Sequence, residues 1–166
     1  MRIFTVKNTL IIIIVILVGL QFVQPERTNP AEEAPIVVTD DVAAIMQTSC
    51  NDCHSNKTVW PWYSKVSPVS WFIADHVNTG RRHLNFSVWE NYPEKRKLRK
   101  LDEIMEEVKE GEMPLPVYTP LHEGADLTDS EKKTLLTWAQ ASMDSLKMQN
   151  PGMESAEQED EHEEDH

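Results

Sequence analysis

The sequence predicts an all-α protein, in which a small helical domain at residues 40–148 follows an N-terminal apolar helix. Apolar residues recur in the domain at the three- and four-residue spacing of a helix. No stretch of useful length alternates apolar and polar residues as a half-buried strand would, and no segment repeats. The chain has 166 residues, which is room for one modest domain. We therefore expect a single helical core.

Residues 1–23 are predicted to be a signal anchor or transmembrane segment. Arg2 and Lys7 precede an almost unbroken run of Ile, Val and Leu. Residues 9–23 would span roughly 22 Å as a helix, which is shorter than the ~30 Å hydrocarbon core of a bilayer. A cleaved signal peptide is therefore an alternative, although no small-x-small cleavage site follows the run. Because the positive charge precedes the run, we expect a single-pass protein of the cytoplasmic membrane whose domain faces the periplasm.

Residues 24–39 are predicted to form a linker, because three prolines divide a short stretch that has little to bury. The domain then begins with a short amphipathic helix, which Asp40 opens and which leads directly into Cys50. A second helix is expected to open at Pro68 and to run towards Gly80.

Two longer helices are expected in the second half of the domain. The first begins near Pro93 and ends at Gly111. Its apolar face consists of residues spaced three, four and three apart: Leu98, Leu101, Met105 and Val108. The second begins at Thr128, which can form a capping box with Glu131, and continues to about Leu146.

Residues 149–166 are predicted to be a disordered acidic tail. From Glu154 to Asp165 there are eight acidic residues and no Lys or Arg. The formal net charge of the whole chain is −12, so the tail carries most of the excess. No basic face of the kind that nucleic-acid binding needs is apparent, and we expect no nucleic-acid partner.

The chemistry is concentrated in the run Cys50-Asn51-Asp52-Cys53-His54, which holds both cysteines of the chain. Two thiols at this spacing can form thioethers with the two vinyl groups of one haem, and the His that follows is placed to ligate the iron. Three other interpretations stay open. A redox-active dithiol would need a βαβ setting, a zinc site could recruit His76 and His83 at a spacing that fits no usual finger, and an exported protein can hold a plain disulfide.

A second axial ligand is expected for low-spin iron, and Met113 is the candidate. It lies in a loop just after a predicted helix end, where Pro114 and Pro116 hold the chain extended. Three histidines are alternative ligands: His76, His83 and His122. Met/His ligation would favour electron transfer, whereas an open sixth site would favour gas binding or peroxide chemistry.

A haem also needs apolar walls and cationic partners for its propionates. Trp62 is a candidate wall residue, and Arg81 and Arg82 are candidate propionate partners. Further candidates for the walls, each of which could equally be core, are Trp60, Tyr63, Trp71, Phe72, Phe86, Trp89 and Leu115.

Several segments together resemble a known family. They are C-N-D-C-H-S-N at 50–56, W-P-W-Y at 60–63, P-V-S-W at 68–71, G-R-R-H-L-N-F-S at 80–87 and M-P at 113–114. Over about residues 41–145 the chain resembles the bacterial haem-binding-domain family, which is related to cytochrome c. The resemblance implies a small cytochrome c-like helical domain around one covalent haem c, attached at Cys50 and Cys53 and ligated by His54. It also implies Met113 as the distal iron ligand, but neither a reaction nor a partner.

The function expected from the sequence is that of a monohaem c-type cytochrome, an electron carrier rather than a catalyst, which serves an unidentified redox partner protein. One alternative is a haem-based peroxidase or a gas or redox sensor with an open sixth site. The other is a non-haem module that holds a disulfide or zinc.

Overall fold

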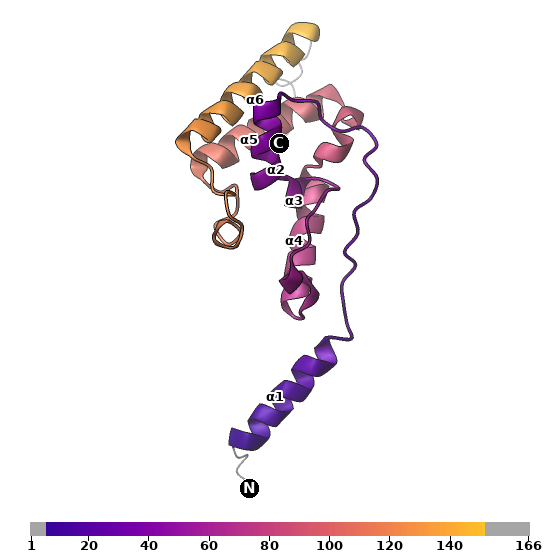
Figure 1. Ribbon diagram of the computed structural model, residues 1–166. Helices are drawn as coiled ribbons and strands as arrows, with labels where there is room; N and C mark the ends of the chain where they lie inside the picture. Colours follow the sequence, from indigo (N-terminus) through magenta and orange to yellow (C-terminus); the bar gives the residue numbers. More distant parts are fainter. Residues whose placement is uncertain (1–5, 152–166) are drawn as a thin grey trace, which may run out of the picture. The chain divides into compact units, whose positions relative to one another are not determined.

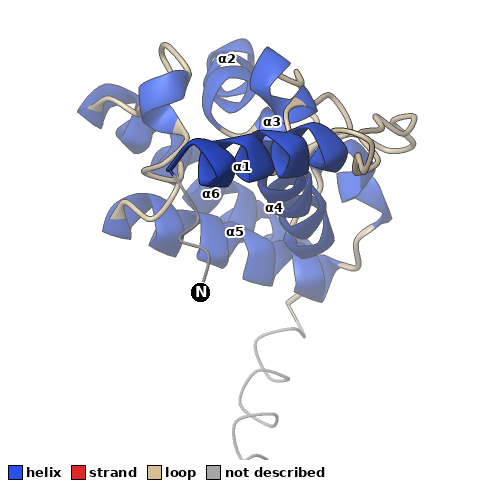
Figure 2. Cartoon of the chain, turned by 90° about the horizontal axis from the view of Figure 1, so that it is seen from below, coloured by secondary structure: helices blue, strands red, loops and turns tan. Residues whose placement is uncertain are grey.

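A computed structural model describes residues 6–151 of the chain. Every regular element in this range is helical, and Figure 2 shows no strand among the described residues. The all-α prediction is therefore confirmed for this part of the chain. The α-helices are α1 (Val6–Leu20), α2 (Asp40–Ser49), α3 (Asn51–His54), α4 (Val69–His83), α5 (Glu94–Glu110) and α6 (Asp129–Gln149). Three short 3₁₀ helices lie between them: η1 (Trp62–Lys65), η2 (Phe86–Asn91) and η3 (Thr119–Leu121).

The described residues divide into two units. The first holds residues 6–31 and 52–85, and the second holds residues 32–51 and 86–151. The boundary falls between Asn51 and Asp52, inside the C-x-x-C-H run. Residues 152–166 of the predicted tail and residues 1–5 of the predicted anchor lie outside the described residues.

In the second unit α5 packs against α6, and α2 packs against α6 (Figure 1). The apolar face predicted for α5 is buried along its whole length, as helical periodicity requires. Helix α6 contributes Leu135 and Ala139 to this core. The buried apolar residues of α2 are Val42, Ile45 and Met46.

Local signals set the ends of these two helices where the sequence predicts them. Helix α5 ends at Gly111, whose φ of 77° lies in the left-handed region that glycine adopts without strain. At the start of α6 the Thr128 hydroxyl accepts from the Glu131 N–H at 3.3 Å, and the Glu131 carboxylate accepts from the Thr128 N–H at 2.9 Å. This is the predicted capping box, and such a cap contributes about 1 kcal/mol.

The second half of the predicted linker is extended and bound to η2. The Ile36 N–H donates to the Phe86 carbonyl at 2.8 Å, and the Glu90 N–H donates to the Ala34 carbonyl at 3.0 Å. The linker is therefore not helical, as expected, but it is fastened to its own unit by backbone hydrogen bonds.

In the first unit α4 packs against η1. Helix α4 begins directly after Pro68, as predicted, and ends at His83. The buried residues on this side include three serines spaced three apart: Ser64, Ser67 and Ser70. Their hydroxyls are satisfied, because Ser64 donates to the Pro61 carbonyl at 2.6 Å and the Ser67 and Ser70 hydroxyls lie 3.0 Å apart.

Helix α1 has 15 residues, as many as the predicted apolar run at 9–23, but it begins and ends three residues earlier, at Val6 and Leu20. Within the described part of the chain, no helix combines the length and the apolar character that crossing a membrane requires.

Candidate functional site

The two cysteines and His54 lie on consecutive turns at the junction of α2 and α3. Helix α2 ends at Ser49, and Cys50 caps it with its N–H donating to the Met46 carbonyl at 3.0 Å. The φ of Cys50 is −125°, which breaks the helix before α3 carries Cys53 and His54. Both cysteines are half-buried thiols, and His54 is also half-buried. The local fold thus places the two thiols and the imidazole within five consecutive residues of helical or near-helical backbone.

The imidazole of His54 is held by the backbone of the residue that follows α4. Its Nδ1 lies 3.1 Å from the Leu84 carbonyl oxygen. Because a carbonyl can only accept, Nδ1 is the protonated nitrogen, and the lone pair of the neutral ring is on Nε2. A backbone carbonyl on the far nitrogen is the arrangement that fixes the tautomer and orientation of metal-ligating histidines. The donor chemistry of the site therefore fits a haem iron at Nε2.

A buried pair of amides joins the segment after His54 to the segment after α4. The Asn85 side-chain amide donates to Asn56 Oδ1 at 2.9 Å, and the Asn56 amide donates to the Ala31 carbonyl at 3.0 Å. The Thr58 hydroxyl donates to the Asp52 carbonyl at 2.7 Å. These bonds show that the motif segments 55–56 and 84–85 have a structural role, which is to hold the chain around His54 in place. The resemblance drew attention to both segments, but sequence reasoning did not assign these residues to the site.

Arg81 of α4 clamps the same segment from another side. Its Nε donates to the Ser55 carbonyl at 2.8 Å, and one terminal nitrogen donates to the Thr28 carbonyl at 2.8 Å. The other terminal nitrogen donates to Asn29 Oδ1 at 2.9 Å and to the Thr58 hydroxyl at 2.8 Å. Burial lowers the pKa of Arg81 from its ordinary value. The predicted contact with a haem propionate stays a prediction, and the clamp is a second role that the sequence did not reveal.

Gly80 lets α4 approach the segment at residues 50–54 closely. A Cβ atom at this position would lie 2.6 Å from the Cys53 carbonyl oxygen and 3.1 Å from its carbonyl carbon. Both atoms belong to the backbone, so no side-chain rotation relieves the contact. The packing of α4 on Cys53 therefore requires a residue without a side chain.

We predict that Gly80→Ala lowers the free energy of unfolding. Within a helix this change normally stabilises by about 0.5–1 kcal/mol, but overpacking against the Cys53 backbone costs about 1–3 kcal/mol. The expected net loss is about 1–2 kcal/mol, measured by urea unfolding of the full chain in detergent. Asn78→Ala, at an exposed position of the same helix, serves as the control and is expected to leave stability unchanged or raised. A Gly80→Ala variant as stable as the wild type would contradict the close packing.

The electrostatic surroundings of Cys53 favour the protonated thiol. Burial, followed by the charge of Asp52, raises the pKa of Cys53 to about 11, against an opposing effect of Arg81. Redox-active dithiols and zinc thiolates work through the thiolate, and their surroundings lower the thiol pKa. The protein surroundings of Cys53 act in the opposite direction from what either of those alternatives needs.

Two of the three histidines considered as alternative ligands have partners on their own elements. Among residues 6–151 no group of three His, Cys, Asp or Glu side chains is arranged to hold a metal ion. His76 Nδ1 is 2.9 Å from the Phe72 carbonyl, and the His122 ring stacks on Tyr118 with centroids 3.7 Å apart. His83 is exposed at the end of α4.

Met113 and Trp62 belong to different units. Met113 is a half-buried residue of the second unit, three positions after the end of α5, and its N–H donates to the Glu107 carbonyl at 3.2 Å. Trp62 begins η1 in the first unit and is 77% exposed. Two other predicted wall residues, Phe86 and Trp89, are buried in the second unit.

Comparison with known proteins agrees with the donor set of the site. No curated protein and no solved structure matches the chain. A family model described as a haem-binding domain matches residues 15–141, which is most of the chain and includes residues 50–54 and all of α4. The chain belongs to the haem-binding domain family, and haem is its cofactor.

Proposed function

We propose that the protein is a monohaem c-type cytochrome that transfers single electrons at the outer face of the cytoplasmic membrane. The observation that carries the proposal is the bond between His54 Nδ1 and the Leu84 carbonyl, next to two thiols at the spacing of a c-type attachment run. The haem-binding family supports the cofactor, while covalent attachment, electron transfer and membrane location are parts of the proposal.

The two thiols supply the attachment chemistry. Each S–H would add across one vinyl C=C bond of a bound haem, so that sulfur bonds to one carbon and the hydrogen goes to the other. The double bond is consumed and no oxidant is needed. Cys50 at the end of α2 and Cys53 on α3 would each take one of the two vinyl groups.

His54 would hold the iron from the proximal side through Nε2. The Leu84 carbonyl on Nδ1 orients the ring and raises the basicity of the ligating nitrogen. Bound iron supplies a one-electron couple whose potential depends on the axial ligands. The Asn56–Asn85 pair and the Arg81 clamp keep the backbone on both sides of His54 in place, which limits reorganisation when the charge of the centre changes.

A haem stain and a pyridine haemochrome spectrum test the central claim. The full chain would be produced in a host with c-type maturation and separated on a denaturing gel. We expect haem to remain on the polypeptide and to give the spectrum of a thioether-substituted porphyrin. A well-exported band without haem would overturn covalent attachment and would direct attention to zinc content and thiol titration of Cys50 and Cys53.

Met113 is the proposed distal ligand, because its thioether lies just beyond a helix end in a proline-bounded loop. We predict that Met113→Ala leaves haem attached but removes the iron–sulfur charge-transfer band of the ferric protein and lowers the reduction potential. Absorption spectroscopy and potentiometric titration measure both effects.

Met148→Ala is the matched control for the ligand test, because Met148 is 76% exposed at the end of α6. It should leave the band and the potential unchanged. A band that survives Met113→Ala would exclude Met113 as ligand. Rapid binding of carbon monoxide by the reduced wild-type protein would favour the sensor or peroxidase alternative over electron transfer.

Helix α1 is proposed to tether the protein to the membrane, with Lys7 on the cytoplasmic side. Its 15 residues give roughly 22 Å of helix, so the bilayer would have to thin locally around it or take in the apolar residues that follow. Resistance of the protein to alkaline extraction from membranes supports the tether, and release into the soluble fraction contradicts it.

A further inference from the structure

One end of the first unit presents large apolar side chains to solvent. Trp62 is 77% exposed and Phe72 is 58% exposed, although residues of this kind are usually covered in a soluble domain. The apolar patch, as we call this surface, consists of Phe22, Val23, Trp62, Val66, Val69 and Phe72.

The fold itself turns these side chains outward. Ser64, Ser67 and Ser70 occupy the buried side of η1 and the start of α4, with the small polar groups inward. The large apolar residues occupy the remaining positions of the same stretch, and Val69 and Phe72 are neighbours one helical turn apart. This is the reverse of the usual distribution in water, in which large apolar residues face inward and serines face solvent.

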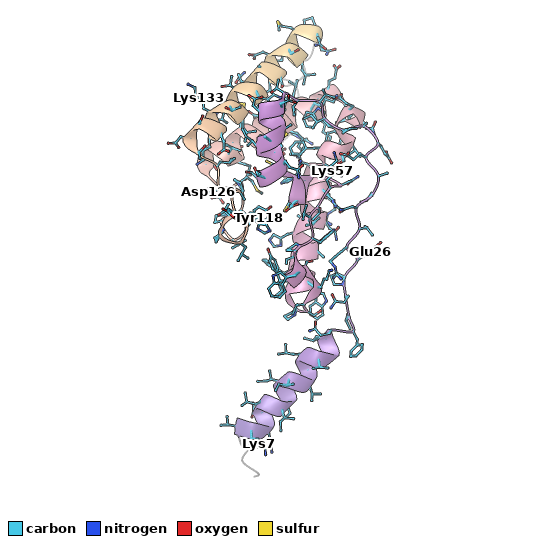
Figure 3. The ribbon with its side chains drawn as sticks, viewed as in Figure 1. Lys7, Glu26, Lys57, Tyr118, Asp126 and Lys133 are labelled. Atoms are coloured by element: carbon cyan, nitrogen blue, oxygen red, sulfur yellow. The ribbon has the colours of Figure 1, made fainter. Side chains whose placement is uncertain are left out.

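The patch is fastened to the end of α1. The Gln21 side-chain amide pairs with the backbone of Ser67 in both directions, accepting from its N–H and donating to its carbonyl, at 3.0 Å each. The Trp71 indole N–H donates to the Val23 carbonyl at 2.7 Å. Figure 1 shows this end of α4 next to the C-terminal end of α1, and Figure 3 shows Lys7 at the opposite end of that helix.

We propose that the apolar patch lies in the headgroup region of the outer leaflet, beside the point where α1 leaves the bilayer. The inference rests on the proposed anchoring through α1. A surface that is hydrogen-bonded to the end of a membrane-inserted helix must lie at the membrane–water boundary, where Trp and other aromatic side chains are favoured. The exposed Lys65 of η1 lies within the patch, and its ammonium group suits anionic headgroups.

The patch also adds apolar surface at the end of α1, where the helix is too short to span the hydrocarbon core. A helix of this length leaves the hydrocarbon core incompletely spanned. Phe22 and Val23 continue the apolar surface beyond the last turn of α1, and Trp62 and Phe72 extend it sideways at the interface. The occupant of the patch is therefore the lipid surface that α1 already enters, and no protein partner is required to cover it.

Photochemical labelling in vesicles tests the proposal. The full-length haem-loaded protein would be reconstituted in vesicles of phosphatidylcholine and phosphatidylglycerol that contain a phospholipid with a diazirine near its headgroup. Lipid adducts would be mapped by mass spectrometry. We expect adducts on α1 and on residues 62–72. The double variant Trp62→Ser, Phe72→Ser should lose labelling of the neighbouring residues 65–69 several-fold while α1 stays labelled.

The matched control is the double variant Val117→Ser, Leu121→Ser, which changes two exposed apolar residues of the second unit. It should leave the labelling pattern unchanged. An unaltered far-ultraviolet circular dichroism spectrum in each variant shows that the helical domain has folded. Labelling of α1 without residues 62–72 would overturn the interfacial patch and leave the anchor intact, whereas an unlabelled α1 would overturn both.

Discussion

The double variant Cys50→Ser, Cys53→Ser is expected to carry no haem through a denaturing gel, a complete loss rather than a partial one. Hydroxyl groups do not add to the vinyl groups under the conditions of c-type maturation, so neither bond can form. Each single variant keeps one thiol and should retain a single thioether. Its pyridine haemochrome band should shift, because one vinyl group then stays conjugated with the ring. The haem stain and the haemochrome spectrum together show whether the haem is held by two thioether bonds, by one or by none.

Asn51→Ser is the matched control for the cysteine variants. It changes a residue inside the same run without removing a thiol, and it leaves Asp52, whose carboxylate accepts from the Val59 N–H at 2.8 Å. Haem content should equal that of the wild type. Covalent haem in the double cysteine variant would show that attachment occurs elsewhere and would refute the assignment of both residues.

The variant Arg81→Ala is expected to lower the free energy of unfolding by about 3 kcal/mol. Its guanidinium holds two backbone carbonyls, an amide oxygen and a hydroxyl; the bonds to Ser55 and Thr58 are partly buried and those to Thr28 and Asn29 are exposed. Hydrogen bonds of a charged donor contribute about 1.5–3 kcal/mol each when they are sheltered and less when they are exposed, and the four do not add fully. Truncation removes the donor and leaves those acceptors to be solvated. Urea unfolding of the haem-free chain in detergent, followed by Trp fluorescence, measures the loss.

Arg82→Ala provides the control at the adjacent position. Arg82 is exposed and bonds the Thr79 hydroxyl within its own helix, so its loss should change stability by less than about 0.5 kcal/mol. The haem-free chain separates the two roles of Arg81. If Arg81 served a propionate alone, Arg81→Ala would leave the haem-free chain as stable as the wild type, and the clamp would be refuted.

The helices of the second unit could be predicted because their signals are local. The apolar spacing on α5 and the Thr128–Glu131 pair each lie within a few residues of chain, where periodicity and capping rules apply. The attachment run was also readable, because the chemistry depends on spacing within five consecutive residues.

The supports of the site could not be read in the same way. Arg81 bonds the backbone of Ser55 and Thr28, which lie 26 and 53 positions away, and any residue type would present the same carbonyls. The Leu84 carbonyl on His54 is likewise invisible in a side-chain pattern. Gly80 was read only as the expected end of a helix, and its packing role appears only with the Cys53 backbone against it.

Aromatic residues were the least informative part of the sequence. Trp62 and Trp89 have the same side chain, yet Trp62 is 77% exposed and Trp89 is 5% exposed. An indole serves a core, a cofactor wall or a membrane surface equally well. Only the direction that the backbone gives each side chain distinguishes these uses.

The segment between α1 and the domain is hydrogen-bonded at several places along its length, among them the Gln21 amide on Ser67, the Arg81 guanidinium on Thr28 and the Asn56 amide on Ala31. Residues 21–31, if flexible, would have an r.m.s. reach of roughly 17–20 Å, and these bonds remove that freedom. If α1 is the membrane tether proposed above, the haem would not reach its partner on a flexible arm. Encounter would then depend on lateral diffusion of the whole molecule, which would confine the search to two dimensions and favour a partner that travels in or on the same membrane.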